Sequence, residues 1–324
     1  MVILDPVKTE ERESARTETI VTGRPRRTRP GGLPQESKGY RVYLGFNAVA
    51  LVVISAVTLY PFATLIAQSF SSSGAIKAGL VNLLPVGFNL DTYHAVTNDQ
   101  HFWRSYGNTV MYTVVGTLVA MVLTTLLAYV MSKEHLRGRN VLIGIAVFTM
   151  FFNGGIIPNY VLISSLELKN TMWAVILPGA MSVFNLLVMK SFFENLPREL
   201  EEAARIDGLG WWGIFWRIAM PLSKPVIATM TLFYSVQFWN DWFSAFLYLD
   251  QTDLYPLSLH LRNLIAGATT TTAESAAAVG TTSAAIKDNV KAVTMVLAII
   301  PILCVYPFVQ RHFVSGVMLG AVKG

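Results

Sequence analysis

Six long apolar runs dominate this sequence and restrict it to a small set of folds. Each run has roughly the 20 residues that a helix needs to cross a hydrocarbon layer about 30 Å thick, and only the fifth contains a charge, Asp241. The runs cover residues 44–70, 105–132, 141–166, 170–189, 225–249 and 292–310. They are too long for barrel strands, and backbone groups in lipid must bond within helices or closed barrels. The sequence therefore predicts an all-α integral membrane protein with six transmembrane helices.

The distribution of Lys and Arg predicts how these helices are oriented. Six spans place both termini on one side of the membrane. That side would hold nine basic residues before Leu44, three in residues 133–140, five in residues 190–224 and two after Gln310, against six on the other side. Because basic loops favour the cytoplasm, we expect both termini and both basic loops to be cytoplasmic.

Residues 1–38 form a separate basic segment, with RPRRTRPGG at its centre. Its composition cannot bury enough apolar surface to offset the entropy of ordering. We therefore predict a disordered cytoplasmic tail, followed by a six-span domain over residues 39–324. The tail could bind lipid headgroups or nucleic acid, but a solvated positive flank is the preferred interpretation. We expect contact with membrane lipid and no nucleic-acid partner.

Motifs for catalysis and metal binding are missing from the sequence. The five histidines are scattered without an HExxH pairing, and Cys304 is the only cysteine. The chain also has no GxxxxGK[ST] loop. We expect no metal site and no cofactor in this chain, so any ATP and Mg²⁺ must be bound by a partner.

One segment interrupts the apolar pattern: residues 194–221, hereafter the charged loop, with eight charged side chains between Glu194 and Arg217. At about 2.5 kcal/mol or more per charge, burying these in the bilayer would cost on the order of 20 kcal/mol. The charged loop must lie in water or against protein.

The local pattern of the charged loop predicts two helices and a turn. Asn195 is expected to cap a helix with Pro197 in its first turn, and Gly208 is expected to end it. Small residues in the stripe Leu196, Leu200, Ala203 and Ala204 would let a partner approach closely. The aromatic stretch WWGIFW suits a membrane interface. From the residues alone, this loop could equally be an interfacial elbow between the fourth and fifth spans.

The stretch EAARIDG at residues 202–208 is followed by nine residues, then Ile218, one residue, and Met220 with Pro221. This spacing resembles the EAA loop of ABC importer permeases, with Met220 in place of the usual Leu. The segments FTMFFNGGIIPNYVLI, ATMTLFYSVQFWNDWF and LYPLSLHLR are similar to those of carbohydrate importer permeases for oligosaccharides and polysaccharides, among them the larger membrane subunit of alginate importers.

The resemblance implies the ABC importer permease fold in the bacterial cytoplasmic (inner) membrane. It also implies a second homologous permease subunit, two cytosolic ATPase subunits and an extracytoplasmic sugar-binding protein. The charged loop would be a coupling helix that docks into a cleft of the ATPase. The residues that would make this contact are Leu200, Glu202, Ala203, Ala204, Asp207 and Gly208.

Polar residues within the spans are candidates for the substrate path, because such groups face a cavity or another helix. They are Asn153, Asn159, Asn185, Gln237, Asn240 and Asp241, with Trp239 and Trp242 as sugar-stacking faces. Hydrogen bonding between helices is the competing interpretation. An ion-coupled secondary transporter is an alternative function, but we would then expect several buried carboxylates or unwound half-helices. An intramembrane enzyme would need a catalytic pairing that does not appear.

Overall fold

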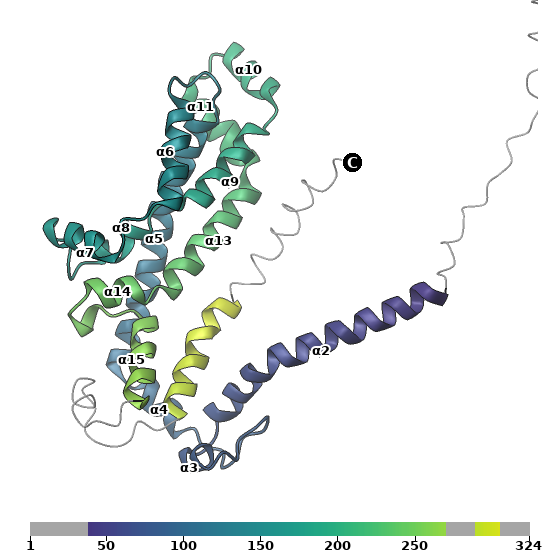
Figure 1. The fold of residues 1–324 in the computed structure, drawn as a ribbon, viewed down its shortest axis with the longest axis vertical. Coiled ribbons are helices and arrows are strands. Elements are labelled where there is room, and N and C mark those ends of the chain that lie inside the picture. The colour runs from purple at the N-terminus through teal and green to yellow at the C-terminus, as the bar shows by residue number, and fades with distance from the viewer. Residues whose placement is uncertain (1–37, 270–288, 305–324) are drawn as a thin grey trace, which may run out of the picture. The chain divides into compact units, whose positions relative to one another are not determined.

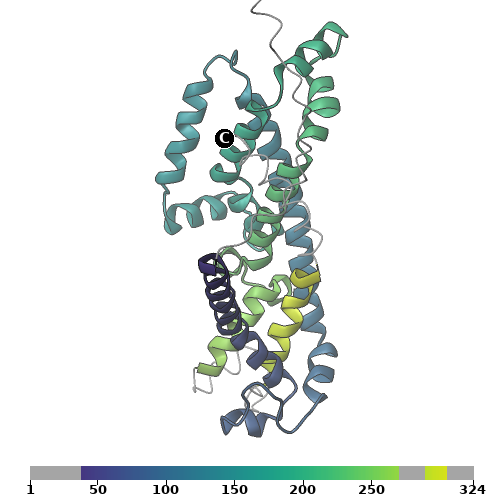
Figure 2. The ribbon, with the colours of Figure 1, turned by 90° about the vertical axis from the view of Figure 1, so that its right-hand side faces the viewer.

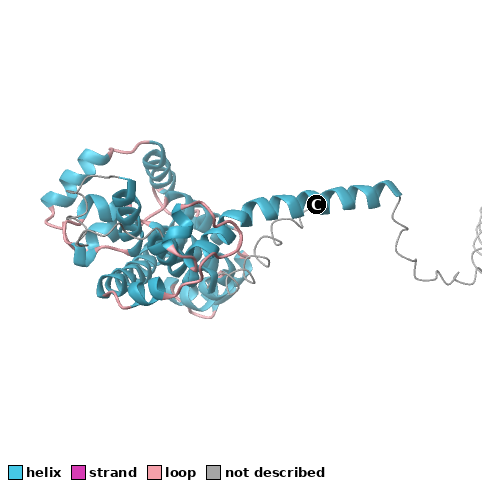
Figure 3. Cartoon of the chain, turned by 90° about the horizontal axis from the view of Figure 1, so that it is seen from below, coloured by secondary structure: helices cyan, strands magenta, loops and turns pink. Residues whose placement is uncertain are grey.

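Helices make up the regular structure in the part of the chain that the structure describes. The computed structural model describes residues 38–269 and 289–304, and every regular element among them is helical. Figure 3 shows these residues as helices joined by loops, without a strand. The all-α prediction is therefore confirmed. The predicted tail of residues 1–38 lies outside the described residues, except for Lys38.

The helices follow one another with mostly short connections (Figure 1). Their bounds are α2 Lys38–Ser69, α3 Ser73–Lys77, α4 Asp91–Thr97, α5 Gln100–Ser132, α6 Arg139–Phe151, α7 Ile156–Ser165, α8 Met172–Gly179, α9 Val183–Glu194, α10 Arg198–Ile206, α11 Trp211–Ile214, the π-helix η1 Phe215–Ala219, α12 Met220–Leu222, α13 Lys224–Asn240, α14 Phe243–Tyr248, the 3₁₀ helix η2 Thr252–Leu254 and α15 Leu257–Thr269. A further apolar helix covers Asn289–Cys304.

The structure divides after Leu59, so that most of α2 belongs to one unit and the described residues from Tyr60 onward belong to a second. In the first unit the apolar side chains of α2 are largely exposed, and Val42, Phe46 and Val57 have exposed fractions of 73%, 74% and 69%. Apolar side chains on all sides are typical of a helix surrounded by hydrocarbon. The first predicted span is confirmed as a continuous apolar helix, Val42–Ser69.

The second unit is organised around α5, which is 33 residues long and confirms the second predicted span. The helices α9 and α13 pack along it (Figures 1 and 2). Small residues of α5, including Gly116, Ala120 and Ala128, are buried. A Cβ atom on Gly116 would lie 2.9 Å from the ring of Phe238 on α13. Small residues thus permit the close helix approach on which packing in lipid depends.

A buried apolar cluster joins the last turns of α5 to α9, η1 and α13. Its centre is Tyr129, whose ring lies 5.6 Å from the ring of Phe193 and 4.9 Å from that of Phe215. Such ring pairs add to the stability that buried apolar area provides. The cluster holds both ends of the charged loop against α5.

The third predicted span is a bent pair of apolar helices rather than one straight helix. The helices α6 and α7 are bent by 113° at a break that contains Asn153, Gly154 and Gly155. Gly155 has a φ of 90°, which residues with a Cβ rarely adopt. Because glycine is uncharged, the two glycines do not interrupt the apolar run, and the length and hydropathy of the run give no sign of the break.

The fourth and fifth predicted spans are also interrupted. The helices α8 and α9 are bent by 53° after Pro178 and Gly179. The fifth run divides into α13, which ends at Asn240, and α14, which begins at Phe243. With 17 residues and a rise of about 1.5 Å per residue, α13 is close to membrane thickness on its own. Of the sixth run, only the part up to Cys304 lies within the described residues.

We predict that Gly116→Ala loosens the contact between α5 and α13, because the added Cβ meets the Phe238 ring at 2.9 Å. Overpacking of this kind costs about 1–3 kcal/mol, so the thermal unfolding temperature in detergent should fall by several degrees. The matched control is Gly107→Ala on the same helix, where no atom lies within 4 Å of the new Cβ. Equal melting temperatures for the two variants would contradict the packing role of Gly116.

Candidate functional site

The charged loop contains a short exposed helix, α10, which lies at one end of the second unit beside α11 (Figure 1). The predicted cap is wrong in its position. Asn195 ends α9, where its side-chain amide donates to the Ser191 carbonyl at 2.7 Å, and Pro197 takes the N-cap position of α10. The reason is that α9 continues to Glu194, beyond the predicted end of the fourth span at residue 189, so the linker to α10 is only three residues long.

The end of α10 is a left-handed turn at Gly208, as predicted. Gly208 has a φ of 81°, and its amide donates to the Arg205 carbonyl at 3.0 Å. The Leu209 amide donates to the Ala204 carbonyl at 2.9 Å. These two bonds form a Schellman motif, in which glycine is favoured because it has no Cβ.

The exposed side of α10 combines apolar and acidic side chains. Of the six predicted docking residues, Leu200, Glu202, Ala203, Asp207 and Gly208 are exposed, whereas Ala204 is 4% exposed and packs against its own chain. Ile206 has an exposed fraction of 86%, and sequence reasoning missed it. Its spacing of three residues from Ala203 and four from Glu202 was the signal that could have found it. Leu200 and Ile206 are thus the exposed apolar side chains of a helix that is otherwise largely charged.

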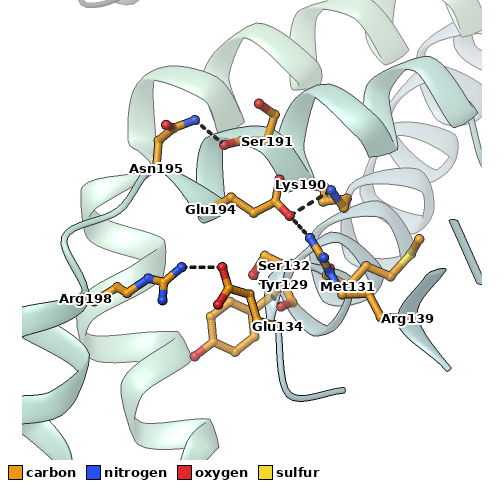
Figure 4. Close-up of polar contacts among 10 residues, drawn as sticks. All are labelled: Tyr129, Met131, Ser132, Glu134, Arg139, Lys190, Ser191, Glu194, Asn195 and Arg198. Atoms are coloured by element: carbon orange, nitrogen blue, oxygen red, sulfur yellow. Dashed lines mark hydrogen bonds and ion pairs between the residues drawn. The ribbon is translucent and has the colours of Figure 1, made fainter. Parts of the chain in front are cut away.

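Ion pairs lie beneath α10. Glu194 at the end of α9 accepts from Lys190 at 2.8 Å and from Arg139 of α6, and Glu134 pairs with Arg198 of α10 (Figure 4). Lys133 pairs with Glu201 of α10. The Arg198 guanidinium, which hydrogen-bonds Glu134, holds the pKa of that carboxyl below its ordinary value.

Aromatic side chains cover the second half of the charged loop. Trp211, Trp212 and Trp216 are exposed, and the Arg205 guanidinium lies 4.1 Å from the ring of Trp211. Tryptophan is enriched where protein meets the membrane–water interface. Both readings of the loop therefore have a structural basis: α10 offers a binding surface, and α11 with η1 offers an interfacial one.

Five of the substrate-path candidates come together where α13 ends, and they face different surroundings. Gln237 donates to the Gly179 carbonyl of α8 at 3.1 Å, which is an interhelical bond of the competing kind. Asn240 donates to the Val236 carbonyl at 2.8 Å within its own helix. The Asp241 carboxylate accepts from the Ser244 amide at 3.0 Å and so caps the start of α14.

The two tryptophans of this group make different contacts. Trp239 packs edge-to-face against Tyr106, with the two ring centroids 6.1 Å apart. Trp242 lies 4.9 Å from the guanidinium of Arg262 on α15, which is also 4.2 Å from the ring of Phe246. No carboxylate within residues 38–269 and 289–304 pairs with Arg262. Sequence reasoning missed Arg262, because it follows the fifth span and only the fold brings it to the end of α13.

The other three candidates lie elsewhere in the unit. The Asn153 side chain accepts from the Gly155 amide at 2.9 Å in the break between α6 and α7, and Asn159 is exposed on α7. Asn185 is buried in α9 with an exposed fraction of 4%. In the part of the chain that the structure describes, no hydrogen bond connects these residues with residues 237–242.

A buried tyrosine that sequence reasoning missed holds the bend between α8 and α9. The Tyr234 hydroxyl of α13 lies 2.7 Å from the Thr124 hydroxyl of α5 and accepts from the Ser182 amide at 3.0 Å. Tyr234 is fully buried. Non-helical backbone at membrane depth is tolerated only where protein or a water-filled cavity satisfies it, and Tyr234 supplies one such partner.

Comparison with known proteins places this architecture. Residues 117–318 match the family described as binding-protein-dependent transport system inner membrane component. Protein LplC of Bacillus subtilis is 43% identical over 89% of this chain and 97% of its own length. The polygalacturonan/rhamnogalacturonan transport system permease protein YtcP of the same organism is 39% identical over 85% of this chain and 96% of its own.

A solved structure is similar over most of the chain. It is the crystal structure of a bacterial ABC transporter involved in the import of the acidic polysaccharide alginate. One of its chains is 36% identical, with a TM-score of 0.78, and the match covers 87% of this chain and 100% of that one.

We predict that Gly208→Ala weakens the end of α10, because a Cβ in the left-handed conformation costs about 1 kcal/mol. Hydrogen exchange of the Gly208 and Leu209 region should then be about fivefold faster. Gly210→Ala is the matched control, since Gly210 has a φ of −74° and an equally unobstructed Cβ position. Unchanged exchange in Gly208→Ala would show that the turn tolerates a side chain.

Proposed function

The chain belongs to the family of inner membrane components of binding-protein-dependent transport systems, and on this premise we propose that it forms, with a second permease, the translocation path of an ATP-driven importer for an acidic oligosaccharide or polysaccharide. It is a transport subunit that works with other ABC components and a binding protein. In the proposed assembly, two cytosolic ATPase subunits bind ATP and Mg²⁺, and an extracytoplasmic protein delivers the sugar.

The observation that carries the proposal is the geometry of α10. This helix exposes Leu200 and Ile206 beside Glu202 and Asp207, and buries only Ala204. A partner with an apolar cleft and basic rim would complement this surface, and charge-assisted hydrogen bonds would fix its register. We assign this surface to the ATPase, so that α10 is the coupling helix of the importer.

The orientation follows from the same assignment. If α10 meets a cytosolic ATPase, the loop at residues 133–139 lies on the cytoplasmic side with it, in agreement with the excess of Lys and Arg in both loops. The termini would then be cytoplasmic too. A tail before residue 39, followed by a permease domain, completes the proposed organisation.

An ion-coupled secondary transporter is the second candidate, favoured by one observation. The breaks between α6 and α7, α8 and α9, and α13 and α14 resemble the discontinuous helices that such a transporter would be expected to have. The family assignment and the exposed surface of α10 favour the ATP-driven importer. The breaks then serve the same physical purpose in it, which is to line the path with polar backbone.

We predict that Ile206→Asn reduces copurification of the ATPase subunits and ATP-driven uptake in proteoliposomes, because it removes the most exposed apolar side chain of α10. A buried apolar contact of this size contributes about 1.5–3 kcal/mol, so uptake at limiting ATPase concentration should fall about tenfold or more. Ile206→Leu keeps the apolar volume and should behave as wild type. Wild-type uptake by Ile206→Asn would refute the assignment of α10 as the coupling helix, and uptake that follows an ion gradient without ATP would refute the ATP-driven importer.

The acidic character of the substrate is supported by a second set of observations. Relatives of this chain carry the names of transporters for polygalacturonan and for alginate. Arg262 stacks beside Trp242 next to the end of α13, and Ser258 of the same helix donates to the Asp241 carbonyl at 3.1 Å. A stacked guanidinium keeps its planar edge free for a carboxylate. We therefore propose Arg262 as a contact for uronate groups, with Gln237, Trp239, Asn240, Asp241 and Trp242 along the sugar path; Asn153, Asn159 and Asn185 remain candidates for the same path.

We predict that Arg262→Gln raises the KM for uptake of an oligouronate about tenfold or more, since charge-assisted hydrogen bonds contribute about 1.5–3 kcal/mol. Uptake of any neutral oligosaccharide that the complex accepts should change little. Arg104→Gln is the control, because it removes the same charge from a side chain that already pairs with Asp253 at 2.6 Å. An equal loss for acidic and neutral sugars would assign Arg262 a structural role instead.

A further inference from the structure

We infer that the segment Lys133 to Arg139, between α5 and α6, anchors α10 in addition to the short connections of α10 to α9 and α11. In this anchor, Lys133 is the positioning residue through which α10 transmits force to α5. The inference rests on the proposed function of α10 as the coupling helix. It concerns a contact within this chain rather than the contact with the ATPase.

The need for such an anchor follows from how little of α10 is packed. Ala204 is the only residue of α10 that is buried, and Ile206 is almost fully exposed. Its connections to α9 and α11 are short turns around Leu196 and Gly208. A helix with so small an apolar contact takes little of its orientation from the core, because burial of apolar area is the main source of such stability.

The charged contacts of α10 supply what the core does not. Lys133 and Glu201 form an ion pair in which their side chains are 13% and 16% exposed. The Lys133 ammonium also lies 4.2 Å from the ring centroid of Tyr129 on α5. Glu201 lies in the first turn of α10, where the helix dipole favours a carboxylate. Lys133 is thus held from both sides, by α5 and by α10.

The same segment also holds the end of the helix that precedes α10. Arg139 pairs with Glu194 at the end of α9, and its Nε atom donates to the Met131 carbonyl of α5 at 2.8 Å. Lys190 pairs with the same Glu194 oxygen at 2.8 Å. The chain therefore enters α10 from a position that is fixed to α5, and Lys133 fixes α10 itself (Figure 4 shows the Glu194 contacts).

An open pocket lies between α10 and the adjoining ends of α5 and α9, and most of the side chains that line it are charged. Its volume is about 270 Å³, and its lining includes Lys133, Glu134, His135, Arg198, Glu201 and Glu202. The part-buried Lys133–Glu201 pair crosses this pocket and joins α10 to the end of α5.

A second ion pair joins the same two elements and serves as an internal control. Glu134 and Arg198 have exposed fractions of 65% and 70%. Exposed pairs contribute little, whereas removing one partner of the part-buried Lys133–Glu201 pair leaves the other charge unpaired where water reaches it poorly, at a greater cost. Neutralising each pair therefore separates the effect of anchoring from that of net charge.

The test uses the complete reconstituted complex with its ATPases and binding protein, and measures sugar uptake per ATP hydrolysed. We expect Lys133→Met and Glu201→Gln to lower this ratio about tenfold, equal to about 1.4 kcal/mol. Glu134→Gln and Arg198→Gln should leave it within about twofold, because exposed pairs contribute less than about 1 kcal/mol. Lys133→Arg keeps the charge and should retain most coupling.

Charge reversal gives a second measurement if Lys133→Met assembles poorly. The single variants Lys133→Glu and Glu201→Lys should both be uncoupled, and the double variant should recover part of the lost ratio, since the pair is restored. Wild-type coupling in Lys133→Met, an equal loss in Glu134→Gln, or no recovery in the double variant would overturn the anchor. If Ile206→Asn also behaves as wild type, the coupling-helix proposal fails instead, so the two failures are distinguishable.

Discussion

The ring of Phe238 on α13 fills the space beside a glycine of α5 and a glycine of α8, and the arrangement of the second unit depends on that contact. A Cβ on Gly116 would lie 2.9 Å from this ring, and one on Gly179 would lie 3.3 Å from it. Two glycines on neighbouring helices therefore make room for one aromatic side chain. Gly179 also ends α8 at the bend, so the tight packing and the interruption of the helix occur at the same place. Tyr234 and Gln237, on the same helix as Phe238, bond the backbone of the bend.

Different interactions hold the two ends of α9: neutral hydrogen bonds at its start and ion pairs at its end. At its start, neutral hydroxyl and amide groups satisfy the bend, as membrane depth requires. At its end, Glu194 gathers two cations, and the next helix is held mainly by charge. This change from neutral hydrogen bonds to ion pairs follows the change from hydrocarbon to water that the sequence predicts. The proposed roles follow it as well, with the sugar path near the bends and the ATPase surface at the ion pairs.

The sequence was a good guide to what charge and hydropathy control, and a poor guide to backbone geometry. The apolar runs, the charged loop and the turn at Gly208 all have strong local signals, and the structure contains them. The breaks after Phe151 and Gly179 were missed because Gly and Pro interrupt a helix without lowering hydropathy. Asn195 was misplaced because α9 runs longer than its apolar run. Arg262 and Lys133 could not be found from spacing, since their partners are distant in sequence and only the fold brings them near.

The exposure of Ile206 has a consequence for the life of the chain before assembly. This side chain has an exposed fraction of 86% and lies on a helix with few packing contacts. In a subunit that is not assembled with its partner, it is available for non-specific apolar contacts. A subunit made in excess would therefore present the same signal that unfolded proteins present to chaperones and proteases. Degradation of unassembled subunits would then keep the subunits in a balanced ratio, because a bound partner covers Ile206 and protects the assembled copies.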